Sequence, residues 1–187
     1  MTFVRPPLKQ KVSGDSNTEA GIEALEITIG DFTEYGYAQN PTRVVTIEKG
    51  SKTDPNYFLE SGDILIAVKA NTGKVSIVSN AADLTKDIPW VVNQSCLILR
   101  CKDKIQPKVL FMYLSSEMGQ YLLRSISSGA TIPLIQLARL KELQIVIPPQ
   151  QEAEAIIRDF DRLVELQSQI ETVKQQQKTL SSFHWSL

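Results

Sequence analysis

The chain has 187 residues, of which 42% are apolar and 22% charged, and its formal charge is -1. This composition excludes a disordered chain, a collagen-like chain and a disulfide scaffold. No run of about 18 apolar residues occurs, so no membrane-spanning segment is expected, and the N-terminus lacks the apolar core of a secretory signal. The two cysteines, Cys96 and Cys101, therefore suggest reduced thiols and a cytoplasmic protein.

The charge divides unevenly at Pro149. Residues 1–148 carry 16 basic and 15 acidic side chains, a net of +1, whereas residues 149–187 carry 4 and 6, a net of -2. A non-specific nucleic-acid binder would be basic overall, so this balance argues against one. It permits a local basic face on the first part of the chain.

The first hundred residues are mostly β in pattern. Residues 1–20 are polar and predict a loose arm. The clearest element is a hairpin with strands at 64–68 and 74–79 around the turn residues Asn71 to Gly73. An aromatic-rich loop is expected at 30–41. Further strands are expected at 25–29, 43–47 and 91–101.

After residue 106 the spacing of the apolar residues changes to that of a helix. A helix is predicted over 107–127, with one or two helical turns within 134–141 and a strand over 143–148 that ends at two prolines. These elements indicate an α+β fold. A β-rich domain with small helices would span 1–148, and a long helix would span 149–187.

Residues 150–182 contain no Gly or Pro and show a seven-residue repeat. Six of the eight seam positions are aliphatic, which predicts a coiled coil of about four heptads and roughly 50 Å. The other two seam positions are Asp159 and Gln177, which would set register or orientation. The residues expected to mediate dimerisation are Ile156, Leu163, Leu166, Ile170, Val173 and Leu180.

This helix is too long for the domain to bury, so it needs a partner. One interpretation folds it back on residues 107–127; the favoured one pairs it with a second copy. Near its start, Ile157, Phe160 and Val164 widen the apolar surface. There we expect additional packing on the helix's own domain or on a second partner.

The sequence matches no known motif for catalysis or metal binding. The single histidine, His184, has no partner nearby in sequence, and the two cysteines match no zinc spacing. Gly73-Lys74 resembles the end of a phosphate loop, but Val68 stands where that loop needs glycine. Asp63 with Lys69 is the nearest nuclease-like pair, although Asp63 fits better in a turn that starts a strand. We therefore predict no catalytic residue, no metal and no cofactor, and hence no enzyme.

Binding residues are more plausible. Lys69, Asn71 and Lys74 flank the hairpin tip, and a loop-rich stretch before it holds Arg43, Lys49 and Lys52. Lysine and arginine bind phosphates, and arginine or asparagine can also read base edges. From spacing alone, ordinary solvated surface charges are the favoured interpretation.

A resemblance to a known protein family shifts the interpretation of these side chains from surface charges toward DNA binding. The segments that carry it are, in order along roughly 25–182, Leu59–Leu65, Gly73, Asn93–Gln94, Pro107 with 111–123, Gly129–Thr131 with Ile135, Leu140–Leu143, Ile145–Pro149 and the long helix. As an ordered set, these segments are similar to type I restriction–modification specificity subunits. Where that family usually has Pro-Pro-Leu-x-Glu-Gln-x-x-Ile, this chain has Ala153 in place of the Gln that follows the Glu.

The resemblance implies a target recognition domain that reads double-stranded DNA. Recognition residues vary with the target, so the resemblance does not transfer them, and Thr131 joins the six side chains above on residue type and predicted loop position only. Family members usually carry two such domains and two antiparallel helices, so this chain resembles half a subunit. Two copies would pair as a homodimer with antiparallel helices and read an inverted repeat. DNA methyltransferase subunits would supply the chemistry with S-adenosylmethionine. Whether a restriction subunit joins is left open.

Two other interpretations stay open. The chain could be a protein-interaction or regulatory module that dimerises or pairs with a complete specificity subunit. It could also be a truncated remnant without a function of its own.

Overall fold

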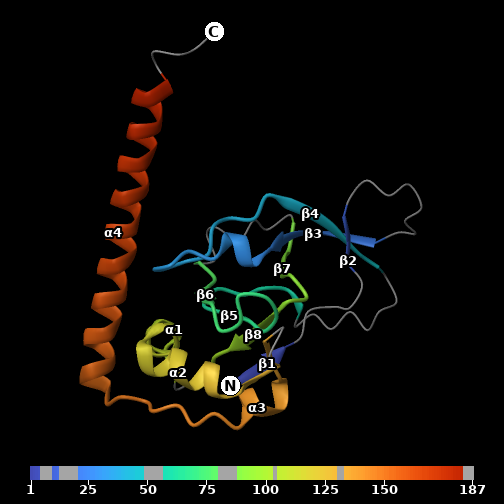
Figure 1. Ribbon diagram of the computed structural model, residues 1–187, viewed down its shortest axis with the longest axis vertical. Coiled ribbons are helices and arrows are strands. Elements are labelled where there is room, and N and C mark those ends of the chain that lie inside the picture. The colour runs from blue at the N-terminus through green and yellow to red at the C-terminus, as the bar shows by residue number, and fades with distance from the viewer. Residues whose placement is uncertain are drawn as a thin grey trace.

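The computed structural model describes residues 1–4, 10–12, 21–48, 57–79, 88–102, 105–129 and 133–182. Lys49, Lys52, Thr131 and His184 lie outside the described residues. The chain forms two four-stranded sheets, a group of short helices and one long C-terminal helix (Figure 1). This confirms the predicted α+β class.

The first sheet is the middle layer of the domain. Its strand order is β1 (Thr2–Val4), β8 (Cys96–Arg100), β5 (Ile64–Ala67) and β6 (Val75–Ile77), and all neighbours are antiparallel. Side chains alternate across a strand, so β5 serves two cores. Ile64 and Ile66 enter one core, and Leu65 and Ala67 enter the other. The predicted β5–β6 hairpin is confirmed.

The second sheet has the order β2 (Gln10–Val12), β4 (Arg43–Glu48), β3 (Gly21–Ile27) and β7 (Trp90–Val92). Its pairs are antiparallel except β3 with β7, which run parallel. A short 3-10 helix, η1 (Ile29–Asp31), follows β3. The Asp31 carboxylate accepts hydrogen bonds from the backbone N and Oγ1 of Thr28, at 2.7 and 2.8 Å, and fixes this turn.

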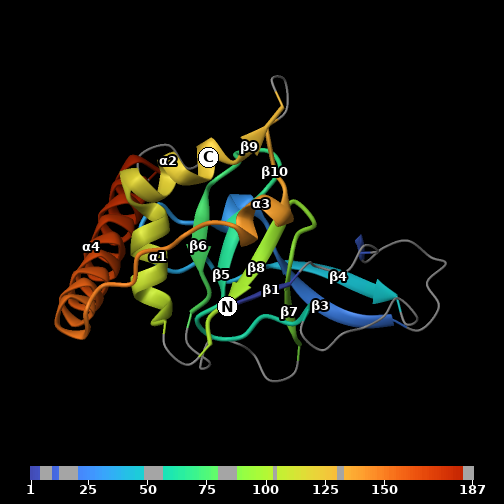
Figure 2. The ribbon, with the colours of Figure 1, turned by 90° about the horizontal axis from the view of Figure 1, so that it is seen from below.

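Short helices cover the other face of the first sheet. They are α1 (Pro107–Ser115), α2 (Glu117–Ser125) and α3 (Leu137–Lys141), with the small ribbon β9 (Ser127–Ser128) and β10 (Leu134–Ile135) between the last two. The ribbon extends from one end of the domain (Figure 2). Leu110, Phe111 and Leu114 of α1 join the core beneath β5 and β6.

Three predicted boundaries were wrong because tertiary contacts override local pattern. The expected loose arm 1–20 instead supplies β1 and β2, each paired with a strand distant in sequence. The expected strand 91–101 is two strands in different sheets. They are separated by a turn in which the Asn93 side chain accepts a 2.6 Å hydrogen bond from the Ser95 backbone. The stretch 143–148 forms no ladder and runs as extended chain.

The predicted helix 107–127 was also wrong in one respect: it breaks into α1 and α2 at Ser116. The Ser116 hydroxyl caps α2 by accepting from the Gly119 N–H at 3.2 Å. A Cβ on Gly119 would lie 2.1 Å from the Tyr113 carbonyl oxygen, so the tight corner requires glycine. The break turns Met118 and Tyr121 outward, where they are 60% and 64% exposed.

The long helix, α4 (Gln150–Ser182), has 33 residues and confirms the predicted one. Its first half lies along α1 and the loop after β3, and its second half stands clear of the domain (Figure 1). In the described part of the chain, no helix is both long and apolar enough to cross a membrane.

Candidate functional site

The first half of α4 is anchored to the domain by an aromatic cluster. Phe160 is fully buried and meets Tyr37 and Phe111 edge to face, with ring centroids 5.3 and 5.5 Å apart. Lys108 Nζ lies 5.4 Å from the Phe160 ring centroid and donates to the Asp161 carboxylate at 2.6 Å, which raises the pKa of Lys108. The start of α4 therefore packs on its own domain.

The aromatic-rich loop at 30–41 forms the other side of this anchor. Gly36 has φ +106, and a Cβ there would lie 3.0 Å from Cγ2 of Val164. Glycine is thus required both by the backbone conformation and by the close approach to α4. The loop identified in the sequence is a docking site for the helix.

The second half of α4 exposes its apolar seam. Leu166, Ile170, Val173 and Leu180 are 38%, 49%, 52% and 72% exposed. An apolar stripe on a helix is stable when another surface covers it, yet in the described part of the chain these four side chains stay exposed. The seam is therefore a candidate interaction surface.

The tip of the β5–β6 hairpin is a second candidate site. Its backbone is strained, because Ala70 and Asn71 have φ of 47° and 40° without being glycine. Two contacts hold it in place. Thr72 Oγ1 donates to the Pro133 carbonyl at 2.8 Å, and Gln120 Nε2 donates to the Gly73 carbonyl at 3.0 Å. Strain held by outside contacts is a feature of functional sites.

A hollow beside this tip is lined mostly by apolar side chains and partly by polar ones. The hollow has a volume of about 390 Å³, and Lys69, Gln94 and Gln136 are among its lining residues. Arg124 is exposed and lies one helical turn after Gln120, which contacts the tip. We define the tip surface as Lys69, Asn71, Gln94, Arg124 and Gln136; it holds two cations and three amides and no acid.

Two other predicted contact residues have partners within the domain. Lys74 Nζ donates to the Phe32 carbonyl at 2.8 Å. Arg43 lies 2.9 Å from Glu26 Oε2, at ion-pair distance but outside hydrogen-bond geometry. Burial raises the pKa of Glu26, and Arg43 partly offsets that rise. The structure therefore brings Lys69 and Asn71 together and gives Lys74 and Arg43 internal partners.

Asp63 has a structural role in a buried clasp. Both oxygens of its buried carboxylate accept hydrogen bonds from Arg100, each at 2.8 Å. The same guanidinium donates to the exposed Glu60 at 2.6 Å and to the Phe58 carbonyl at 2.8 Å. This clasp joins the end of β8 to the turn before β5.

The two cysteines are free thiols inside the domain. Burial raises the pKa of Cys96 to about 12 and that of Cys101 to about 11. Among the residues that the structure describes, no three His, Cys, Asp or Glu side chains are grouped to hold a metal ion.

Residues 22–180 match the family model described as the type I restriction modification DNA specificity domain. The chain belongs to this family. The match spans both the tip surface and nearly all of α4. It thus covers the two candidate sites together.

Relatives agree with this assignment. The specificity subunit of the type I restriction enzyme MjaIX from Methanocaldococcus jannaschii is 30% identical over 136 residues, which cover 71% of this chain and 29% of that protein. The crystal structure of the HsdS subunit from Thermoanaerobacter tengcongensis aligns with a TM-score of 0.53 at 21% identity, covering 94% of this chain and 37% of that one.

A second solved structure gives the same result. A chain from a study of complex assembly and conformational transition of the type I R-M system aligns with a TM-score of 0.55 at 20% identity. The alignment covers 96% of this chain and 39% of that one. At these identities the structural likeness is one of fold. The chain spans well under half the length of the relatives it matches.

For this specificity domain, sequence reasoning missed the residues that complete the tip surface. Gln94 and Gln136 come from separate segments, and only the folded chain brings them beside Lys69 in the lining of one hollow. Arg124 lies one helical turn after Gln120, which contacts the tip. Gln94 carried a signal, because it belongs to the Asn93–Gln94 motif. Arg124 carried none, because its position depends on the corner at Ser116.

Proposed function

We propose that this chain recognises double-stranded DNA for a type I restriction–modification system. In this proposal, residues 1–148 form the target recognition domain, and residues 149–187 form the pairing segment that contains α4. The chain is not an enzyme, and DNA methyltransferase subunits carry out the chemistry. The observation that carries the proposal is the family match over 22–180, which includes the tip surface and α4.

The tip surface offers the side chains that DNA reading needs. Lys69 and Arg124 would bind backbone phosphates and orient the domain, while the amides of Asn71, Gln94 and Gln136 can pair with base edges. Of the other predicted contacts, Lys49, Lys52 and Thr131 remain candidates. Arg43 and Lys74 are proposed only as supports, because both hold partners within the domain.

The α4 seam is symmetric about Ser168, which supports antiparallel pairing of two copies. When two helices run antiparallel about this centre, residue numbers facing each other add to about 336, as the seam positions show. The resulting layers are Ile156 with Leu180, Leu163 with Val173 and Leu166 with Ile170, each with its counterpart in the partner. Asp159 then faces Gln177, so polar side chains pair with polar ones and aliphatic side chains with aliphatic ones.

Parallel pairing in register is less favourable. It would place Asp159 against Asp159 of the partner subunit, and like charges across a seam repel. The distribution of charge along the helix also favours antiparallel pairing. Residues 150–166 have five acidic and two basic side chains, whereas residues 167–182 have one acidic and two basic side chains. An antiparallel pair sets the acidic half against the basic half.

Antiparallel pairing places two identical domains at opposite ends of the helix pair, related by a two-fold axis. Such a dimer reads an inverted repeat whose spacer is set by helix length. The helix surface that pairing leaves free is the proposed docking surface for methyltransferase subunits.

Salt-dependent DNA binding tests the reading step. We expect specific binding near 50 mM salt that weakens steeply as salt rises, because released counterions drive it. Lys69→Ala and Arg124→Ala together should reduce the slope of log affinity against log salt by about 2 per domain. Lys178→Ala, a charge change on the distal part of α4, is the matched control. Absence of binding with methyltransferase subunits present would refute the reading step.

Light scattering tests the pairing step. Ile170→Asp should convert a dimer into a monomer, because it puts a charge into two symmetric apolar layers. Ser168→Asp is the control, since that exposed position faces away from the seam. A wild-type monomer at micromolar concentration would contradict pairing.

One observation favours a protein-interaction module instead. The domain carries a net charge of only +1, and Arg43, Lys74, Arg100 and Lys108 are engaged internally. Such a module would dimerise through the same seam but would show no DNA binding at low salt. The salt titration separates the two functions.

A further inference from the structure

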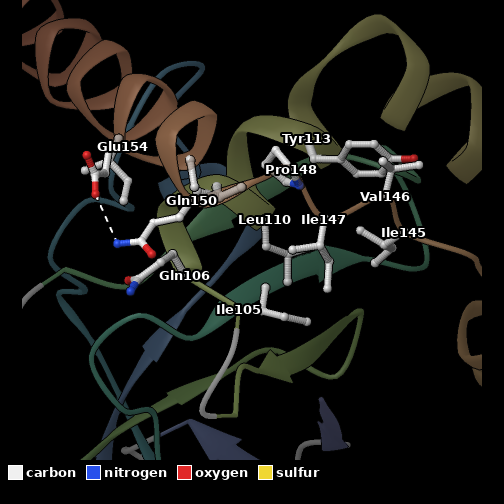
Figure 3. A pocket seen from close by; sticks show the side chains of 13 residues that line it. Ile105, Gln106, Leu110, Tyr113, Ile145, Val146, Ile147, Pro148, Gln150 and Glu154 are labelled. Carbon is white, nitrogen blue, oxygen red and sulfur yellow. Dashed lines mark hydrogen bonds between the residues drawn. The ribbon is translucent and has the colours of Figure 1, made fainter.

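An apolar groove lies where α4 meets the domain. It is bounded by α1, the extended chain 145–148 and the first turns of α4, and has a volume of about 360 Å³ (Figure 3). Val109, Tyr113 and Ile157 are among its lining residues. At its edge Val146 and Ile147 are 72% and 55% exposed, which is a large exposure for adjacent aliphatic side chains.

The sequence after α4 has the chemistry of an occupant. Residues 183–187, which lie outside the described residues, read Phe-His-Trp-Ser-Leu. Phe183, Trp185 and Leu187 alternate with polar residues, so an extended segment would present all three on one side. At the groove edge Gln150 and Glu154, which hydrogen bond at 3.3 Å, offer acceptors for an indole N–H.

This segment cannot reach the groove of its own chain. From Ala153, which lines the groove, to Ser182 the helix rises by roughly 44 Å at 1.5 Å per residue. Five extended residues span at most about 18 Å. An occupant of this sequence must therefore come from another molecule.

Antiparallel pairing brings it there. With facing residues adding to about 336, Ser182 of the partner subunit, the last residue of α4, lies level with Glu154 at the groove edge, and five extended residues after it can span up to about 18 Å. We propose that residues 183–187 of a second copy bind in the groove between α1 and α4, with Trp185 as the main anchor. This inference rests on the pairing part of the proposed function. It extends the interface from the helices onto the domain, so each copy would be held to the other at both ends of the pair.

Trp185 fluorescence in the full-length chain tests the proposal. The only other tryptophan, Trp90, is 3% exposed, so quenching by iodide reports mainly on Trp185. At concentrations where light scattering gives a dimer, we expect weak quenching that increases on dilution to monomer. Val146→Glu should increase quenching in the dimer and weaken dimerisation at least about 10-fold. Gln144→Glu adds the same charge to an exposed position outside the groove and should change neither.

A second variant distinguishes loss of this contact from an indirect effect of Val146→Glu on the fold. Trp185→Ala should weaken dimerisation as much as Val146→Glu, and the double variant should be little weaker than either single one, because both remove the same contact. A dimer whose Trp185 is quenched equally in wild type and Val146→Glu overturns this inference and leaves pairing intact. A wild-type monomer overturns pairing and this inference together. Protection that persists on dilution to monomer overturns the second copy as the occupant.

Discussion

Phe160→Ala tests the anchoring of α4 most sharply. The side chain is fully buried and forms two edge-to-face ring contacts. Burying a phenylalanine contributes about 1.5–3 kcal/mol, and each aromatic pair adds about 0.5–1.5 kcal/mol. We therefore expect the free energy of unfolding to fall by about 3–5 kcal/mol, as for other buried phenylalanines.

The measurement is urea unfolding in an Ile170→Asp background, because a monomer makes the unfolding free energy independent of protein concentration. Hydrogen exchange should also show faster exchange in the first half of α4. Tyr121→Ala is the control, because this aromatic is 64% exposed and its loss should cost about 0.5 kcal/mol or less. A loss below about 1 kcal/mol for Phe160→Ala would refute the view that this cluster fixes the helix to the domain.

Three further predictions concern the domain. Asp63→Ala should lower the free energy of unfolding in urea by about 3–5 kcal/mol, because it leaves Arg100 without its buried partner. Removal of the exposed Glu60 side chain should lower it by under about 1 kcal/mol, and equal losses would contradict the clasp. The thiol of Cys96, with its pKa near 12, should react with a thiol reagent at pH 8 only on unfolding, and fast labelling of the native chain would contradict its burial. Burial raises the folded-state pKa of Glu26 above 4.5, so the folded chain binds that proton more tightly than the unfolded chain does. The unfolding free energy of Glu26→Gln minus that of wild type should therefore be constant below pH 4.5 and rise as pH increases through the raised pKa. A difference that falls over this window would contradict the dominance of desolvation.

The elements with a strong local signal were predictable from sequence. The heptad repeat and the absence of Gly and Pro predicted α4, and the alternation around Asn71–Gly73 predicted the β5–β6 hairpin. Phe160 was correctly expected to widen the apolar surface at the start of the helix. Each of these features depends on residues close together in sequence.

The elements that failed depend on distant partners. β1 becomes a strand by pairing with β8, nearly a hundred residues later, and its three residues carry no pattern of their own. Lys74 resembled a surface cation, yet it extends to the Phe32 carbonyl in another layer. The tip surface was only partly predictable for the same reason, since Gln94 and Gln136 reach the hollow beside Lys69 only through the fold.

Selection of binding sites from random double-stranded DNA tests the central claim most directly. The full chain, with methyltransferase subunits added, would be used at a concentration where it is dimeric. We predict enriched sequences that form an inverted repeat with one fixed spacer, because two identical domains are held apart by paired α4 helices. Enriched sites without inverted symmetry, or with variable spacing between half-sites, would contradict the account.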